Sequence, residues 1–392
     1  MQRPLPRAFW ILWTGALINR LGGFVMPLLA LYLTGARGMR VEEVGFIISL
    51  LGAGTLCAGP VGGFLSDHIG RRRTLLFALV SGALAMIHLA IALSPAHIAA
   101  AAFLLGLFGD LYRPAVSAAI ADLVEPADRV RAYGHLYWAV NLGFAVGSAL
   151  GGLLARHGWY LLFYGDAATT LAYAVIVWLR VGETRPAPAA EERRPPPWAP
   201  LGDRPFLIFV VLTMLVWMLL LQSFTTLPVD LREHGIAPST YGLLIAINGV
   251  LIVLLQPFAS RALGRFPRHR VLAGSAALIG IGFGLTAAMR SIPGYALAIV
   301  IWSLGEIVMA GIGPTVTADA APPGLRGAYQ GLFQGGIGAA ALLAPSLGSL
   351  VLGHFGSRAL WLSCAAVGFT AAAGQLLLGM RRKPALLSST VR

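Results

Sequence analysis

The chain has 392 residues, of which 57% are hydrophobic and only 11% are charged, and its mean hydropathy is +0.76. A soluble globular protein has roughly a quarter of its residues charged, so this composition excludes a soluble enzyme and indicates a chain surrounded mostly by lipid. The formal charge is +13, yet the sequence contains a single lysine, Lys383 in the tail. A nucleotide-binding P-loop and a Schiff-base lysine within the fold are therefore excluded.

Twelve apolar runs of about 20 residues or more follow one another along the chain, separated by polar breaks. Runs of this length predict helices, because the strands of a membrane barrel are short and alternate in polarity. Arg20 interrupts the first run, so we interpret it as an uncleaved span and not as a signal peptide. The predicted spans are 9–33, 43–66, 74–93, 98–122, 132–155, 159–180, 205–229, 239–262, 270–289, 293–318, 328–353 and 357–380.

The basic residues are distributed unequally between the two sides of these spans. With both termini in the cytoplasm, 21 of the 29 flank the spans on the cytoplasmic side and six lie outside, while Arg20 and Arg113 lie within spans. This bias predicts a multi-pass protein of the cytoplasmic (inner) membrane of a bacterium, with both termini cytoplasmic. Topology and attraction to anionic lipid account for the charge, so we expect no nucleic acid partner.

Residues 182–204 are rich in proline, alanine and charge and have no apolar period, which predicts a cytoplasmic linker. The linker separates an N-terminal six-helix bundle, residues 1–181, from a C-terminal bundle with a short basic tail, residues 205–392. A shift of 196 to 197 positions aligns the two halves at Pro60 and Pro257, Arg71 and Arg268, Asp122 and Asp319, Arg129 and Arg326, and Ala132-Tyr133 and Ala328-Tyr329. Two parallel repeats predict a cavity between the halves near the middle of the membrane.

The loop after the second span reads GFLSDHIGRRR from Gly63 to Arg73. Except at His68, it resembles the Gly-x3-Asp-(Arg/Lys)-x-Gly-Arg-(Arg/Lys) signature of the major facilitator superfamily, and the similarity extends over the whole chain. The resemblance implies an all-α membrane protein with twelve transmembrane helices in two pseudo-symmetric six-helix bundles.

The same resemblance implies that this loop is part of a cytoplasmic latch that holds one access state. In the second half, the matching segment from Ser260 to His269 has no acid, so we expect an asymmetric latch. Alternatively, the arginines serve topology alone. The predicted latch residues are Gly63, Asp67, Gly70, Arg71 and Arg72, with Asp122, Arg129 and Arg131 as partners.

The fifth span has a glycine spacing that resembles the drug/proton antiporter group of the superfamily. The proline expected after the third glycine of that motif is replaced by Ser148, and close helix packing is an alternative explanation for the spacing. Asn19-Arg20-Leu21-Gly22 and Arg113-Pro114 also resemble the proton-coupled multidrug exporters. The motif glycines are Gly134, Gly143, Gly147, Gly151 and Gly152.

Five ionisable residues fall within the spans: Arg20, Asp110, Arg113, Asp166 and Glu306. Each costs about 2.5–3.5 kcal/mol at a helix centre, so a functional role is the default interpretation. Asp110 and Arg113 are three residues apart and share a helix face, which predicts either a coupled pair or mutual neutralisation for insertion. Glu306 has no basic residue on its helix and burial favours a protonated carboxyl, so we expect it to carry the proton; a hydrogen-bonded structural role is the alternative. We place Asp166 nearer the outer surface, in helix packing or an outer gate.

Polar and aromatic residues at similar depths are candidates for the wall of a substrate cavity, although each is also compatible with packing between helices. No metal-binding motif is present in the sequence, so we expect no metal site. The candidates are Asn19, Tyr137, Trp138, Asn141, Trp217, Gln222, Asn248 and Gln334.

These patterns predict a secondary active transporter, a proton-coupled antiporter that exports hydrophobic or amphipathic small molecules by alternating access, as in multidrug efflux. A proton symporter or facilitator for a sugar, peptide or organic anion is the alternative, and a membrane receptor or enzyme is a distant one. We expect a monomer that is not an enzyme and needs no cofactor other than protons as the coupling ion.

Overall fold

The computed structural model describes residues 4–39, 41–155, 157–185, 196, 198–236, 238–322 and 324–381, and this part of the chain contains helices and no strands. Residues 186–195 and 197 of the predicted linker, and the tail after Arg381, lie outside the described residues.

The first half consists of helices that correspond to six predicted spans. They are α1 (Arg7–Leu21), α2 (Val25–Leu31) with the π-helical turn η1 (Tyr32–Ala36), α3 (Val41–Ile69), α4 (Arg71–Ile91), α5 (Pro95–Asp110), α6 (Tyr112–Leu123), the short turn η2 (Pro126–Asp128), α7 (Arg129–Ala155) and α8 (Tyr160–Arg180).

The second half repeats this order after the short turn η3 (Ala199–Gly202). Its helices are α9 (Arg204–Thr225), α10 (Leu227–Glu233), α11 (Pro238–Leu263), α12 (Arg268–Thr286), α13 (Ile292–Ala310), α14 (Ile312–Ala320) and α15 (Arg326–Arg381). Gly356 divides α15 into two spans, because its φ of 79° and ψ of 172° are not helical.

Four spans are interrupted, and each interruption lies two to five residues before a proline. The breaks fall at Gly22–Phe24, Leu111, Thr226 and Gly311, ahead of Pro27, Pro114, Pro228 and Pro314. Proline lacks the N–H of a helical hydrogen bond and its ring collides with the preceding turn, which accounts for the breaks. They occur in the first, fourth, seventh and tenth spans, so the interruption follows the repeat.

Within the described residues, nine helical segments are long and apolar enough to cross a membrane. One of them, Arg326–Gly379, holds two spans on either side of Gly356, and two others, Pro95–Leu123 and Ile292–Ala320, are interrupted spans counted whole. The broken first span and α7 supply the remaining two, which makes the twelve spans expected from the sequence.

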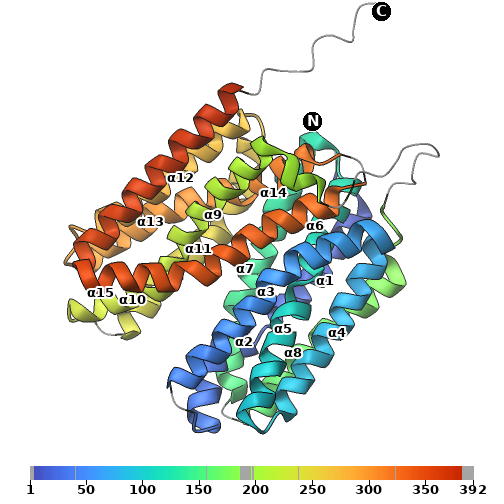
Figure 1. Ribbon diagram of the computed structural model, residues 1–392, viewed down its shortest axis with the longest axis horizontal. Coiled ribbons are helices and arrows are strands. Elements are labelled where there is room, and N and C mark those ends of the chain that lie inside the picture. Colours follow the sequence, from blue (N-terminus) through green and yellow to red (C-terminus); the bar gives the residue numbers. More distant parts are fainter. Residues whose placement is uncertain are drawn as a thin grey trace, which may run out of the picture.

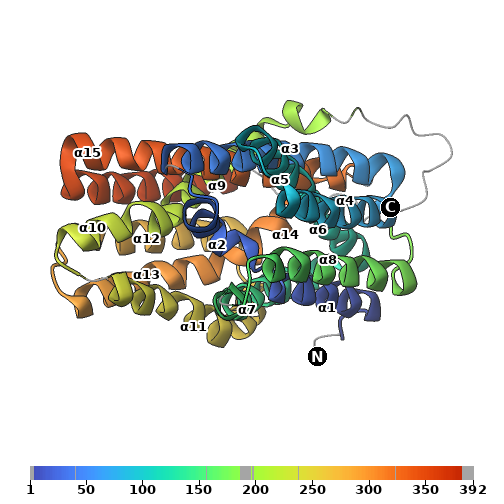
Figure 2. The same cartoon turned by 90° about the horizontal axis from the view of Figure 1, so that it is seen from below.

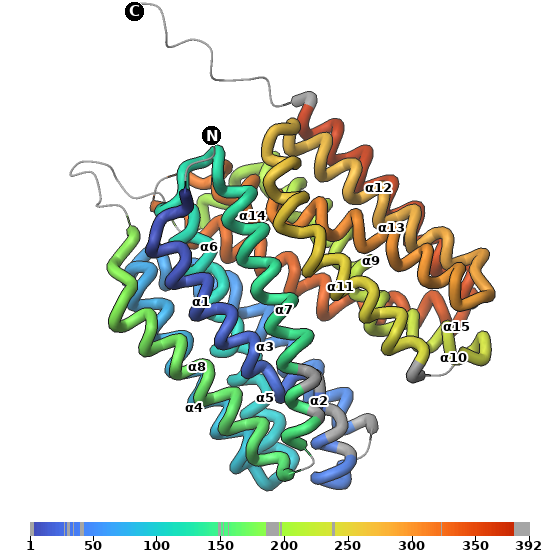
Figure 3. Tube along the Cα trace, turned by 180° about the vertical axis from the view of Figure 1, so that it is seen from behind, coloured from blue at the N-terminus to red at the C-terminus, as the bar shows by residue number. Residues whose placement is uncertain are grey.

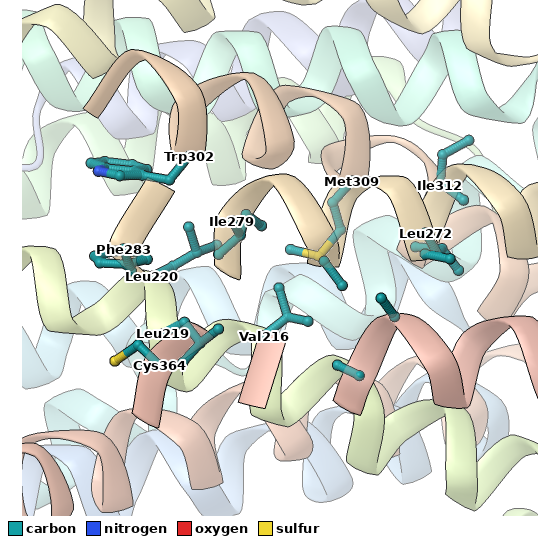
Figure 4. Packing of buried hydrophobic residues seen from close by; sticks show 14 of the residues in the cluster. Val216, Leu219, Leu220, Leu272, Ile279, Phe283, Trp302, Met309, Ile312 and Cys364 are labelled. Carbon is teal, nitrogen blue, oxygen red and sulfur yellow. The ribbon is translucent and has the colours of Figure 1, made fainter. Parts of the chain in front are cut away.

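Each half has its own apolar core. In the second half, Phe283 stacks on Trp302 and on Trp361 with ring centroids 5.4 and 6.0 Å apart, and Figure 4 shows Ile279 and Met309 extending this cluster. In the first half, buried residues such as Phe9 and Tyr173 form one cluster and Phe24 and Phe163 form another. Because lipid is as apolar as these side chains, the clusters stabilise each bundle through close van der Waals packing and not through removal of apolar surface from water.

The halves meet mainly through two helix pairs, α3 with α15 and α7 with α11 (Figure 2), and α6 with α15 and α14 with α6 and α7 add smaller contacts. We call the end of the molecule where α1 begins and α15 ends the basic end; it carries the turns 67–73, 121–131, 263–270 and 319–328 (Figure 1). Near this end Gly59 and Gly63 of α3 lie so close to the backbone of α15 that a Cβ would collide with it. Near the other end Gly45 and Gly353 have no atom within 4 Å of a Cβ position. The halves therefore touch at the basic end and separate toward α2 and α10 (Figure 3).

Candidate functional site

A cavity of about 340 Å³ lies between the two halves, next to the interruptions of the spans. The first half contributes residues from α1, α6 and α7, and the second half contributes residues from α9, α11, α13, α14 and α15. A second cavity of about 350 Å³ lies within the first half and shares Arg20, Tyr112, Arg113 and Asn141 with it. The size of the first cavity suits a small organic molecule.

The interruption at Leu111 brings three of the predicted ionisable residues together. Asp110 ends α5 and Arg113 lies in the first turn of α6, and Arg113 Nε lies 2.7 Å from Asp110 Oδ1. Arg20 Nη2 lies 3.9 Å from the same oxygen and donates a hydrogen bond of 3.1 Å to the hydroxyl of Tyr112. One carboxylate in the wall of the first-half cavity therefore faces two guanidinium groups, and both of these also line the cavity between the halves.

Three of the motif glycines hold α7 against the first span where Arg20 lies. A Cβ at Gly143 would lie 2.5 Å from Arg20 Cβ, and one at Gly147 would lie 2.9 Å from the Arg20 carbonyl oxygen. Gly151 approaches the backbone of Phe24 in the same way. Gly134 instead packs against Ser260 of the second half, and the surroundings of Gly152 lie outside the described residues. The motif thus fixes the position of Arg20 through backbone contact.

Glu306 lies on the second-half wall of the cavity and is 8% exposed. Tyr137 Oη donates to Glu306 Oε1 at 2.5 Å, and Asn248 Nδ2 donates to Oε2 at 2.7 Å. Asn248 also contacts Ser303 Oγ at 3.0 Å. No ion pair to Glu306 occurs among the described residues. The carboxyl is therefore held by neutral donors.

The other predicted wall residues divide into two groups. Trp138 and Gln222 line neither cavity, because Trp138 Nε1 donates to the Val253 carbonyl at 2.8 Å and Gln222 Nε2 donates to the Ala344 carbonyl at 2.9 Å. Both side chains join helices. The residues that do line a cavity are Tyr137, Asn141, Trp217, Asn248 and Gln334 between the halves and Asn19 in the first half.

Some wall residues were not anticipated. Asp166, six residues from the start of α8, is buried and lies in the wall of the first-half cavity together with Arg20. Phe224 and Phe333 give the second-half side of the other cavity an apolar surface. Phe224 stands between Ser223 and Thr225, and Phe333 stands before Gln334, but no local pattern distinguishes an aromatic residue that faces a cavity from one in the core.

At the basic end, Asp67 lies at the centre of a contact between the halves. It pairs with Arg71 at 2.8 Å and accepts hydrogen bonds from the backbone N–H groups of Gly327 and Ala328 at 2.9 and 2.6 Å. These N–H groups belong to the first turn of α15, where the helix dipole favours an anion. Gly63 permits this approach, and Gly70 forms the turn with a φ of 99°.

Two ion clusters beside Asp67 cross between the halves, and they are related by the repeat. Asp122 pairs with Arg71 at 2.9 Å and with Arg326 of the other half at 2.5 Å. Asp319 pairs in the same way with Arg268 of its own half and Arg129 of the other. Arg129 is thus a partner of the second half and not of the first-half loop, while Arg131 pairs with Asp128 at 3.4 Å. Arg72 donates to the Trp178 carbonyl within the first half.

The profile described as Major Facilitator Superfamily matches residues 12–231 and 223–390, nearly the whole chain. The chain belongs to the major facilitator superfamily. The fold class predicted from the sequence, twelve transmembrane helices in two six-helix bundles, is therefore confirmed. Members of this superfamily are membrane transporters of small molecules and not enzymes.

Three relatives of known sequence cover most of the chain. An uncharacterized MFS-type transporter of Bacillus subtilis, YttB, is 28% identical over 97% of each chain. A Na(+), Li(+), K(+)/H(+) antiporter of Planococcus maritimus is 26% identical over 78% of this chain and 80% of its own. The multidrug resistance protein MdtH of Edwardsiella ictaluri is 28% identical over 81% of this chain and 79% of its own.

The fold also matches a solved structure. The human organic anion transporter MFSD10 superposes with a TM-score of 0.79 and 20% sequence identity, over 95% of this chain and all of that one.

Proposed function

We propose that this transporter is a proton-coupled antiporter that exports hydrophobic or amphipathic small molecules across the cytoplasmic membrane of a bacterium. The observation that carries the proposal is Glu306, a carboxyl without a charged partner among the described residues, in the wall of the cavity between the halves. A carboxyl in such a setting can exist in both protonation states, because no arginine holds it in the ionised one. Relatives named as a multidrug resistance protein and as a cation/proton antiporter support the same class.

The wall opposite the arginines suits an apolar substrate. Trp217, Phe224 and Phe333 face the cavity together with Met309 and Ile337. Aromatic and aliphatic side chains bind apolar groups of varied shape without directional bonds, which suits a transporter of several related compounds.

Alternating access gives the coupling a direction. With the basic end on the cytoplasmic side, as the distribution of arginine supports, the halves touch at the cytoplasm and separate outside. A proton then reaches Glu306 from outside, and competition between proton and substrate for this cavity produces exchange. Each inward proton supplies about 2.3 kcal/mol per 100 mV of membrane potential.

Transport in proteoliposomes tests the proposal. Vesicles of one orientation are loaded with a fluorescent lipophilic compound, and an acid pulse is applied on the side away from the basic end. We expect rapid efflux from the wild type and at least tenfold slower efflux from Glu306→Gln, which cannot exchange a proton. Glu233→Gln, the same change at an exposed site at the end of α10, is the matched control and retains wild-type efflux. Wild-type efflux from Glu306→Gln would remove this residue from coupling.

A second candidate, symport or facilitated uptake of an organic anion, is favoured by one specific observation. Arg113 contacts Asp110 through Nε, and its side chain is 37% exposed in the cavity wall. The two terminal nitrogens of a guanidinium can bind a carboxylate in a bidentate manner. The same acid pulse distinguishes the two functions, since it drives an antiported substrate out of the vesicle and a symported anion into it.

A further inference from the structure

One hydrogen bond joins the proposed proton carrier to the opposite half of the molecule. Tyr137 belongs to α7 of the first half, whereas Glu306 and Asn248 belong to α13 and α11 of the second. One oxygen of the carboxyl is therefore bound by the first half and the other by the second half. A change in Glu306 affects a contact between the halves as well as the cavity wall.

We propose that Tyr137 is a positioning residue that links protonation of Glu306 to the access state. In the state described here, its hydroxyl holds the ionised carboxylate of the second half to the first half. A proton on Glu306 weakens this bond and releases the halves to rearrange. The inference rests on the proposed function, because it assigns to Glu306 the coupling proton.

The inventory of donors and acceptors supports this assignment. An ionised carboxylate only accepts hydrogen bonds, and the two donors, Tyr137 Oη–H and Asn248 Nδ2–H, match its two oxygens. Hydrogen bonds to a charged acceptor are about twice as strong as neutral ones. A protonated carboxyl must itself donate a hydrogen bond, so the match with two donors is lost.

Among the described groups around Glu306, Tyr137 makes the contact that changes with the protonation state of the carboxyl. The charged side chains that line the same cavity are Arg20 and Arg113 of the first half, and neither pairs with Glu306 among the described residues. The other titratable groups in the wall are the hydroxyls of Tyr112 and Tyr133. The neutral amide of Asn248, on α11, donates to Glu306. The same amide also contacts the hydroxyl of Ser303, which lies on α13 with Glu306.

The direction of the effect agrees with exchange. In this state the halves are separated at the end away from the basic one, so protons from that side reach the cavity first. Their binding removes the contact that favours this very state. Release of the proton after the rearrangement restores an ionised Glu306, which is ready to hold the halves again when they return.

Distances between spin labels test the inference on the full-length protein. Cys57 and Cys364 are first replaced by alanine, and labels are attached at Ser94→Cys and Glu233→Cys, which are exposed on the two halves at the separated end. In the wild type we expect the ratio of the long-distance to the short-distance population to fall about tenfold between pH 8 and pH 5.5, the change expected for loss of one charge-assisted hydrogen bond. In Tyr137→Phe, we expect the ratio at pH 8 to equal that of the wild type at pH 5.5 and not to change with pH.

Two further variants make each outcome decisive. Asn248→Leu removes the other donor to Glu306 but leaves the bond between the halves, so its ratio still falls on acidification. Glu306→Gln has no pH response. A wild-type ratio and response in Tyr137→Phe, together with a flat Glu306→Gln, would overturn the role of Tyr137 alone. A wild-type response in Glu306→Gln would instead overturn the proposed proton carrier. A monodisperse elution profile for each variant shows that it has folded.

Discussion

Several single residues in this protein matter mainly because they set the position of a neighbouring residue. Gly143 has no chemistry of its own, yet its missing side chain allows α7 to touch the backbone of Arg20. Arg20 in turn completes the cluster with Asp110 and Tyr112. The glycines that resemble an antiporter signature thus allow α7 to pack closely against Arg20.

Gly143→Ala tests this interpretation by adding one methyl group. Because that group would lie 2.5 Å from Arg20 Cβ, we expect a loss of about 1–3 kcal/mol, measured as a lower melting temperature in detergent. Gly52→Ala on α3 is the matched control, since no atom lies within 4 Å of its Cβ position. Alanine is a better helix former than glycine, so the control is neutral or stabilising. Equal losses in the two variants would contradict the packing role of Gly143.

Among the helices, the proline-associated interruptions and the helix ends hold most of the residues that we assign to coupling and to the contacts between the halves. The break before Pro114 allows Asp110 and Arg113 to face the same cavity from two helices, and the break before Pro314 lies just after Glu306. At the basic end, the helix ends are joined by two ion clusters that repeat in the two halves. The repeat in sequence is thus also a repeat in the contacts between halves.

The two clusters differ in burial, which predicts unequal contributions. Asp122 has a side-chain exposure of 2% and Asp319 of 24%, and Arg71, the partner of Asp122, is fully buried. Removing one member of a buried ion pair costs about 3–5 kcal/mol because the other charge stays buried. Removing Asp319 also leaves Arg129 buried, but Asp319 and its second partner Arg268 are partly exposed, so solvent reduces the cost. We therefore expect Asp122→Asn to lower the melting temperature clearly more than Asp319→Asn. An equal decrease would show that burial does not distinguish the clusters.

For the whole molecule, the sequence predicts the number of spans, their order and their division into halves, since each depends on local hydropathy. The spacing of Asp110 and Arg113 likewise predicts their contact, because Leu111 keeps helical backbone angles across the interruption between α5 and α6. Tyr137 and Glu306 are 169 positions apart, and their contact depends on how two bundles dock. No local pattern contains that information.

The ion-pair partner of Arg129 can be predicted from the repeat in the sequence but not from the local pattern around it. The repeat aligns Asp122 with Asp319 and Arg129 with Arg326, so a pair crossing in one direction implies its counterpart in the other. The resemblance to a single loop signature instead led to a first-half partner. The symmetry between the halves therefore predicts the partner of Arg129 correctly, and the loop signature does not.

We propose that Glu306 couples protons to transport but is not needed to move substrate. The most direct test compares two fluxes in proteoliposomes that contain Glu306→Gln: exchange of labelled for unlabelled substrate at equal pH, and net efflux driven by an acid pulse. We expect the rate of substrate exchange in Glu306→Gln to stay within about twofold of the wild type, and the rate of acid-driven efflux to fall at least tenfold. Equal loss of both fluxes, or retention of driven efflux, would contradict it.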